Sequence, residues 1–365
     1  MIINSVNIKN FRNIADLSFT ADSGVNVIYG ENAQGKTNIL EAIWLFTGCK
    51  SFRGAKDNEL IKFGEDFAKI NLEFSDNLRE KKSQIIISDK KKNAFLNGVS
   101  LRSTAELIGS FYAVIFSPVH LSLIKDGPSA RRRFLDTALC QLKPSYAEHL
   151  AGFKRALIQR NALLKDIHLN SQLYDMLDTW DDQLARYSAA VIKERLNYID
   201  LLSDYSKSIY SGISENKENF SVSYSRNKLK RENFSVKDIY LNELEKIKEV
   251  RKDDIISRTT TIGPHRDDLE ILINNVSARS FGSQGQQRSC ALALKLGESE
   301  IIKKVTGENP VALLDDVMSE LDEKRQDYIL NHINDRQVFL TCCDPSQVLR
   351  LGGGKSFLIK DGEII

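Results

Sequence analysis

Cysteine and histidine are both scarce in this sequence, and their positions are scattered. The chain has 5 cysteines and 5 histidines among 365 residues. The cysteines are odd in number and none forms a C-x-x-C pair, so the sequence predicts neither a disulfide framework nor a zinc site. They are Cys49, Cys140, Cys290, Cys342 and Cys343.

Long apolar segments are also missing. No apolar run reaches the roughly 18 residues that a membrane span needs, and the start of the chain, Met1 to Asn4, lacks the basic and apolar regions of a signal peptide. We therefore expect a cytoplasmic protein without a membrane segment. The net charge is only +2, so the overall charge does not indicate a nucleic-acid-binding protein, and any such function must use local patches.

The remaining composition is that of a globular protein, with 42% hydrophobic and 27% charged residues. The pattern of apolar residues predicts an α/β fold with an antiparallel β meander, split by a helical insertion. We place the α/β domain at 1–124 and 254–365, and the helical insertion at 125–253. The expected strands are Met1 to Phe11, Val25 to Tyr29, Lys69 to Phe74, Gln84 to Ser88, Leu269 to Ile273, Val311 to Leu314, Val338 to Thr341 and Phe357 to Ile359.

The insertion shows helical periodicity. Apolar residues recur at spacings of three and four in two segments, which predicts two long helices, the second of about 30 residues or about 45 Å. An antiparallel hairpin within a small bundle and a true coiled coil fit this pattern equally well. The residues are Tyr146, Leu150, Phe153, Leu157 and Leu164, then Leu173, Leu177, Trp180, Leu184, Tyr187 and Val191. A polar stretch, 214–231, and an amphipathic helix near 238–253 follow.

A phosphate-binding loop is the clearest motif. The segment 30–37 matches G-x-x-x-x-G-K-[ST], with an apolar strand before it and an amphipathic helix after it. Its backbone N–H groups and the helix N-terminus would surround a phosphate, while Lys36 reaches the β and γ phosphates and Thr37 binds Mg²⁺. The residues expected to contact ATP are Gly30, Glu31, Asn32, Ala33, Gln34, Gly35, Lys36, Thr37 and Asn38.

A pair of carboxylates follows the apolar run that begins at Val311. Such loops work with an acidic residue at the end of a second buried strand. We expect Asp315 to hold Mg²⁺, directly or through water, and Asp316 to orient or deprotonate the attacking water. Lys36 and Asp316 are therefore the expected catalytic residues, and Thr37 and Asp315 the metal ligands.

A third element, 280–288, places glycine and serine before an alanine- and leucine-rich helix. A helix N-terminus of this kind is a second anion-binding site. Its Ser283, Gly285 and Gln286 match the signature motif of ABC-type ATPases, and the segment 319–322 resembles the D-loop of that superfamily.

The order and spacing of five segments resemble the bacterial RecF family. They are IKNFRN at 8–13, GENAQGKTN at 30–38, GPSARRRFLD at 127–136, GPHRDD at 263–268 and DDVMSELD at 315–322. The resemblance covers essentially the whole chain. It implies that the α/β domain is an SMC-like, ABC-type ATPase head and that 125–253 forms a second lobe.

The resemblance also implies a function. ATP would be held between the phosphate loop of one subunit and the signature of another, giving an ATP-dependent homodimer. This dimer would bind double-stranded or gapped DNA in recombinational repair and replication-fork maintenance, help RecO and RecR to load RecA, and be reset by slow, Mg²⁺-dependent ATP hydrolysis.

Two positions depart from the ABC pattern. Asp316 stands where those ATPases carry a catalytic glutamate, so water would be less well positioned and turnover slow. After the strand at Val338, the position of a switch histidine holds Thr341, Cys342, Cys343 and Asp344 instead. The γ-phosphate sensor is therefore in doubt, and we expect the two cysteines to pack rather than react.

Three basic clusters are candidates for DNA contact: 81–82, 90–92 and 131–133. Phosphate contacts supply most of the non-specific affinity for DNA, but a lysine run beside a hairpin is more often a solvated loop. The three arginines of 131–133 point in different directions on a helix, so we expect at least one to pair with an acid inside the protein.

Two other functions share part of these motifs. The ATPase subunit of a membrane ABC transporter has all three nucleotide motifs, but the long separation of Lys36 from Asp315 and the heptads of the insertion argue against it. A small-molecule phosphotransferase would leave the signature segment without a role.

Overall fold

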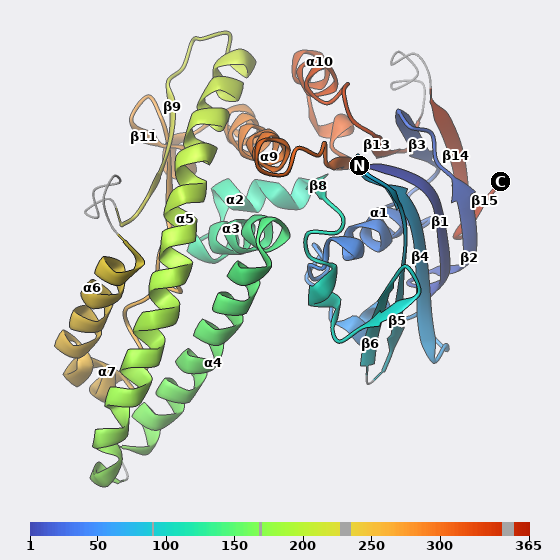
Figure 1. Cartoon of the computed structure of the whole chain (residues 1–365). Coiled ribbons are helices and arrows are strands. Elements are labelled where there is room, and N and C mark those ends of the chain that lie inside the picture. The colour runs from blue at the N-terminus through green and yellow to red at the C-terminus, as the bar shows by residue number, and fades with distance from the viewer. Residues whose placement is uncertain (90, 168–169, 227–234, 345–353) are drawn as a thin grey trace.

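The computed structural model describes residues 1–89, 91–167, 170–226, 235–344 and 354–365, without the side chain of Ser171. These residues form two six-stranded sheets, a three-stranded sheet and a group of long helices. Figure 1 shows the long helices α4 and α5 running side by side away from the strand-rich part of the molecule. Within the described residues, no helix combines the length and apolar character that crossing a membrane requires.

The first six-stranded sheet is the predicted antiparallel meander. Its strands are β1 (Ile2–Phe11), β2 (Ile14–Thr20), β4 (Phe67–Ser75), β5 (Glu80–Ser88), β6 (Lys91–Leu96) and β7 (Val99–Leu101), in the order β2-β1-β4-β5-β6-β7. Burial alternates along β4 and β5, so one face packs on the core. A tight turn joins β6 to β7, with positive φ at both Asn97 and Gly98.

The second six-stranded sheet contains a parallel core. Its order is β15-β14-β3-β13-β12-β8, and only β15 is antiparallel to its neighbour. Because parallel strands end at the same edge, the residues after β3, β12 and β13 are brought together. The strands are β3 (Val25–Tyr29), β8 (Ala113–Phe116), β12 (Val311–Asp315), β13 (Val338–Cys342), β14 (Lys355–Lys360) and β15 (Glu363–Ile364).

A small third sheet joins β9 (Phe220–Tyr224), β10 (Leu269–Ile273) and β11 (Val276–Ser277). Strand β9 lies in the stretch predicted only as polar, of which residues 227–231 lie outside the described part. Its apolar residues alternate with serine, which buries one face of the strand. Since β9 pairs with β10, strands on both sides of 254 share a sheet, and the division into two lobes stays a proposal.

The remaining elements are the helices and short 3-10 turns. The helices are α1 (Lys36–Trp44), α2 (Ser122–Lys125), α3 (Pro128–Leu142), α4 (Pro144–Asp166), α5 (Leu177–Ile213), α6 (Val236–Glu249), α7 (Arg251–Ser257), α8 (Ala278–Phe281), α9 (Gln284–Thr306) and α10 (Glu323–His332). The 3-10 turns are η1 (Leu45–Thr47), η2 (Asp57–Leu60), η3 (Thr104–Leu107), η4 (Pro118–Leu121), η5 (Ser171–Met176) and η6 (Met318–Glu320).

The predicted helical hairpin is formed by α4 and α5. Close packing is visible at Gly152, where an added Cβ would lie 2.3 Å from the Tyr187 ring. Helix α5 has 37 residues, longer than expected, and it also contacts α6, α9 and β9. The hairpin is therefore part of a bundle rather than an isolated coiled coil.

Two details of the helical prediction were wrong. Leu173 lies in the 3-10 turn η5 and not in the second helix, because the chain reverses direction there. The helix expected near 238–253 is interrupted at Val250, which ends α6 and begins α7. The break turns Arg251 toward Asp178 and Asp181 of α5, with nitrogen–oxygen distances of 2.5 and 2.6 Å.

Two of the segments that carry the family resemblance bind each other. Arg131 of 127–136 makes a bidentate pair with Asp268 of 263–268, at 2.6 and 2.8 Å, and Arg132 donates to the Asp267 carbonyl at 2.7 Å. Arg195 of α5 joins the same junction by donating to the Pro264 carbonyl at 2.7 Å. These segments therefore fasten the helices to the strands that follow.

A second buried junction lies further along the hairpin. The side chain of Arg160 is fully buried between Asp181 and Asp254, both fully buried, with nitrogen–oxygen distances of 2.6 Å to each carboxylate. Thr261 also donates to Asp254 from its backbone and its hydroxyl. The junction therefore connects α4, α5, α7 and the segment that follows α7.

We predict that Arg160→Met destabilises the protein by about 3–5 kcal/mol, because it removes the cation paired with buried Asp254 and leaves buried Asp181 with Arg251 alone. Chemical denaturation followed by circular dichroism would measure the loss. The control is Arg186→Met in α5. It removes the exposed ion pair of Arg186 with Asp182 of the same helix and should change stability little. Equal effects of the two substitutions would contradict this role for Arg160.

Candidate functional site

The backbone of the loop 30–37 requires glycine at two positions. Gly30 has φ +147°, and an added Cβ would lie 2.3 Å from the Ile359 carbonyl oxygen. Gly35 has φ +108°, and its Cβ would lie 2.7 Å from Asn13 Oδ1. A side chain at either position would clash with neighbouring groups and strain the backbone. The loop therefore passes close to β14 on one side and to the 8–13 segment on the other.

Lys36 begins α1 and its side chain folds over the loop. Its ammonium donates to the Gly30 and Glu31 carbonyls at 2.6 and 2.8 Å, and the residue is only 8% exposed. The charge is thus held at the mouth of the loop rather than in solvent. A phosphate in the loop would be an alternative, charged partner for the same ammonium.

Thr37 and Asp315 lie in hydrogen-bond contact, although they are far apart in the sequence. The Thr37 hydroxyl donates to Asp315 Oδ1 at 2.7 Å. Burial raises the pKa of Asp315, while hydrogen bonds from Thr37 and Thr341 oppose that rise. A buried carboxylate next to a hydroxyl suits a cation, since a positive ion would offset the loss of hydration.

Asp316 lies at the surface, directly beyond the end of β12. Its φ of 52° turns the chain out of the strand, and its backbone N–H donates to Thr341 Oγ1 at 2.9 Å. Its carboxylate accepts from Ser319 Oγ at 3.1 Å. The aspartate pair is therefore divided between a buried position beside Thr37 and an exposed position at the start of the following loop.

The two adjacent cysteines have different surroundings, which corrects the expectation that both pack. Cys342 is buried, and burial raises the pKa of its thiol to about 11. Cys343 is exposed: its Sγ donates to Asn32 Oδ1 at 3.2 Å and lies 3.8 Å from Lys36 Nζ. The segment after β13 thus places a thiol against the loop, and Thr341 beside the aspartates.

Sequence reasoning missed the arginines around α1. Arg12 makes a bidentate pair with Glu41 at 3.0 and 3.1 Å. Arg53 lies 3.7 Å from the same carboxylate and donates to Asn38 Oδ1 at 2.9 Å, and its charge partly opposes the rise that burial causes in the pKa of Asp315. A signal was present, because Glu41 stands in an otherwise apolar helix and is fully buried, which demands a cationic partner.

The signature segment caps helix α9 as its sequence suggests. Ser283 Oγ accepts from the Gln286 N–H at 3.2 Å, and Gln286 Oε1 accepts from the Ser283 N–H at 2.8 Å. Together with Gly285 they line a polar hollow shared with Lys217, Glu218 and Arg325. This hollow is also lined by Ile213 at the end of α5 and includes no residue of the phosphate loop of the same chain.

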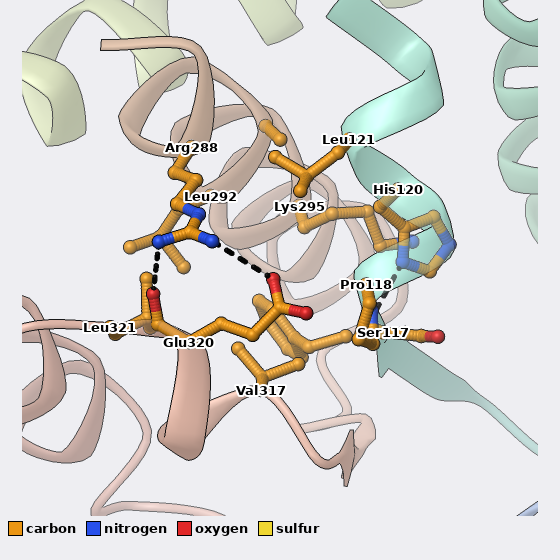
Figure 2. A pocket seen from close by; sticks show the side chains of 12 residues that line it. Ser117, Pro118, His120, Leu121, Arg288, Leu292, Lys295, Val317, Glu320 and Leu321 are labelled. Atoms are coloured by element: carbon orange, nitrogen blue, oxygen red, sulfur yellow. Dashed lines mark hydrogen bonds and ion pairs between the residues drawn. The ribbon is translucent and has the colours of Figure 1, made fainter. Parts of the chain in front are cut away.

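The loop after Asp316 is connected to the signature helix. Arg288 of α9 donates to the Glu320 carbonyl at 2.6 Å, and its guanidinium lies 3.6 Å from the Glu320 carboxylate. Figure 2 shows these two contacts beside a mainly apolar hollow between η4, α9 and η6. The structure therefore couples the 319–322 segment to α9 within one chain.

Residues of all three basic clusters form ion pairs with acidic residues of the protein itself. Lys81 pairs with Asp76 at 2.5 Å, Lys82 with Glu73 at 2.7 Å and Lys92 with Asp57 at 3.1 Å. The pairing of Arg131 with Asp268 confirms that one arginine of 131–133 binds an acid inside the protein. Lys90 lies outside the described residues, and contact of these clusters with DNA stays a prediction.

Known proteins match the chain over its full length. The model of the RecF/RecN/SMC N-terminal domain matches residues 2–351. A DNA replication and repair protein RecF from Lachnospira eligens is 41% identical over 100% of this chain and 99% of its own length. One from Clostridium perfringens is 42% identical over 94% of this chain and 93% of its own.

Solved structures agree with the sequence relatives. A structure of the recombination mediator protein RecF with ATP in the RecFOR pathway has a TM-score of 0.92, with 38% identity over 100% of this chain and 97% of that one. An SMC head bound to the C-terminal winged-helix domain of ScpA, at 15% identity and a TM-score of 0.57, shares the fold. This chain therefore belongs to the RecF family of DNA replication and repair proteins, with an SMC-like, ABC-type ATPase head.

Proposed function

We propose that the protein is an ATP-controlled DNA clamp, in which two copies close around two ATP molecules. The main support is the contact of Thr37 with Asp315 beside Lys36, which assembles one half of an ATPase site. The signature residues line a separate polar hollow of the same chain. A second subunit would supply the signature half of each site.

The residues fit a magnesium ion held together with the nucleotide. The Thr37 hydroxyl and the Asp315 carboxylate are both oxygen ligands, and they already lie in contact. The described residues hold no cluster of three or more histidine, cysteine or acidic side chains that could bind a metal. Magnesium commonly uses one or two protein ligands and completes its shell with phosphate oxygens and water.

The shorter side chain of Asp316, compared with the catalytic glutamate of ABC-type ATPases, supports slow hydrolysis. We propose that its carboxylate orients or deprotonates the attacking water, with Ser319 holding it on the loop. Hydrolysis would then reset the clamp rather than drive chemistry on another substrate. We also propose that the clamp contacts double-stranded DNA through the DNA backbone. It would help RecO and RecR to load RecA at gapped DNA. The relatives named above are DNA replication and repair proteins, which does not favour the alternative of a transporter subunit.

Lys36→Ala should weaken ATP binding by roughly tenfold to a hundredfold. The substitution removes a charge-assisted contact worth about 1.5–3 kcal/mol to the β and γ phosphates. Isothermal titration calorimetry measures the affinity, with Lys9→Ala, an exposed lysine of β1, as the control. An unchanged ATP affinity in the Lys36 variant would refute the assignment.

Ser283→Arg should block ATP-dependent dimerisation and leave ATP binding by the monomer intact. The new side chain places bulk and charge where the γ-phosphate of the neighbouring subunit would lie. Light scattering with and without ATP gives the mass, and calorimetry gives the affinity. If the variant still doubles its mass with ATP, the shared-site arrangement is wrong.

Asp316→Asn should slow hydrolysis by about tenfold or more and change ATP affinity little, because the carboxylate acts mainly when water attacks. The ATP-bound dimer should then remain longer on duplex DNA than the natural protein does. Dissociation into excess competitor DNA is measured at fixed salt, since phosphate contacts depend on ionic strength. Equal or faster release, with slowed hydrolysis confirmed, would show that ATP cleavage does not control DNA release.

Cys343 should be the cysteine that iodoacetamide modifies first, and ATP should slow its modification. Its thiol is exposed beside Lys36, whereas burial raises the thiol pKa of Cys49 and Cys140 to about 12 and lowers their thiolate fraction. Peptide mapping at saturating ATP and Mg²⁺ gives the rates, with Cys140 as the internal reference. An unchanged Cys343 rate under those conditions would contradict a nucleotide at this loop.

A further inference from the structure

Glu218 connects the end of the long helix α5 to the signature segment. It lies between α5 and β9, and its Oε1 accepts from Gln286 Nε2 at 2.6 Å. Its Oε2 accepts from the Tyr210 hydroxyl at 2.5 Å. One carboxylate thus bridges a residue of α5 and a residue of the signature.

The tyrosine is a fixed anchor for this bridge. Tyr210 is fully buried, and its ring stacks on Phe220 of β9 with a centroid distance of 4.7 Å and an interplanar angle of 12°. Burial and the hydrogen bond to Glu218 raise the pKa of the Tyr210 hydroxyl, so it remains a donor. The carboxylate is therefore held in place from the side of the helical bundle.

The bridge fixes both ends of the Gln286 amide. Its Oε1 accepts from the Ser283 N–H, and its Nε2 donates to Glu218. Ser283 Oγ accepts from the Gln286 N–H. Because a hydroxyl has one hydrogen to donate and this contact uses only its acceptor side, the Ser283 O–H remains able to donate to an anion in the hollow.

Helix α10 also contacts the start of α9. Arg325 Nε donates to Ser289 Oγ at 2.9 Å, and Ser289 Oγ donates in turn to the Gly285 carbonyl at 3.0 Å. Arg325 also pairs with Asp322 at the end of the 319–322 segment. The first turn of α9 is therefore supported from two directions, by the α5 side through Glu218 and by the loop after Asp316 through Arg325.

We propose that Glu218 is a positioning residue for the signature, holding Gln286 and thereby Ser283 in the orientation that receives the nucleotide of a second copy of this chain. This inference rests on the shared-site function proposed above. Glu218 acts through Gln286 and does not itself contact nucleotide. It makes the end of α5 part of the dimerisation switch, so a shift of α5 against α9 changes the affinity of the two copies for each other.

The test compares Glu218→Ala with two matched variants in the full-length protein. Glu218→Ala should weaken ATP-dependent association by roughly tenfold to a hundredfold, the effect of losing a hydrogen bond to a charged group, while ATP affinity of the monomer is unchanged. Glu218→Gln keeps a carbonyl that can accept from Gln286 and should retain most of the association. Glu270→Ala, which removes an exposed carboxylate of β10, should behave like the natural protein.

A double-mutant cycle separates positioning from general stability. If Glu218 acts through Gln286, the combined Glu218→Ala and Gln286→Ala variant should associate no more weakly than Gln286→Ala alone. Additive effects, or equal losses in the Gln and Ala variants of Glu218, would overturn the proposal. Should Glu218→Ala fail to fold, the comparison of Glu218→Gln with Tyr210→Phe decides: Tyr210→Phe frees the carboxylate on the α5 side only and should weaken association more than Glu218→Gln.

Ser283→Arg distinguishes this inference from the function on which it rests. If Ser283→Arg dimerises normally with ATP, the shared site itself is wrong. If Ser283→Arg blocks dimerisation and Glu218→Ala does not weaken it, the shared site stands and the role of Glu218 is refuted.

Discussion

The contact between Thr37 and Asp315 is the constraint on which the rest of the site depends. It requires β3 and β12 to end at the same edge of a parallel sheet, with β13 between them. That arrangement also places Thr341 and Cys343 beside the aspartates and the loop. The buried carboxylate is unfavourable without a cation, which supports the proposal that a nucleotide with magnesium binds at this edge. The proposed ATPase chemistry follows from this one edge.

Local patterns predicted much of this edge, because the phosphate loop needs only nearby residues. The apolar strand, two obligatory glycines and a helix beginning at Lys36 are all contained in 25–44, and the structure confirms them. The serine cap of α9 was equally readable. The order of the strands was harder to predict from the sequence, since the pairing of β3 with β13 joins residues from opposite ends of the chain.

The features that were missed depend on tertiary contacts. Strand β8 is four residues long and buried throughout, so it shows no alternation to reveal it. The roles of Arg53 and Cys343 appear only once distant segments meet at the loop. Glu218 lies in a stretch that the sequence describes only as polar. Its proposed role depends on hydrogen bonds with Tyr210 and Gln286, and no sequence motif links these three residues. Through Glu218, these contacts connect α5 to the signature segment.

The central claim is that each ATP lies between two copies of this chain, and mixing two defective variants tests it most directly. A dimer of Lys36→Ala with Ser283→Arg has one site with both defects and one site with an intact Lys36 and an intact Ser283 from different subunits. The measurement is ATP hydrolysis at constant total protein as the ratio of the two variants changes. The account predicts that the mixture exceeds either variant alone, with a maximum near equal amounts. Activity that follows a straight line between the two pure variants would contradict the shared site.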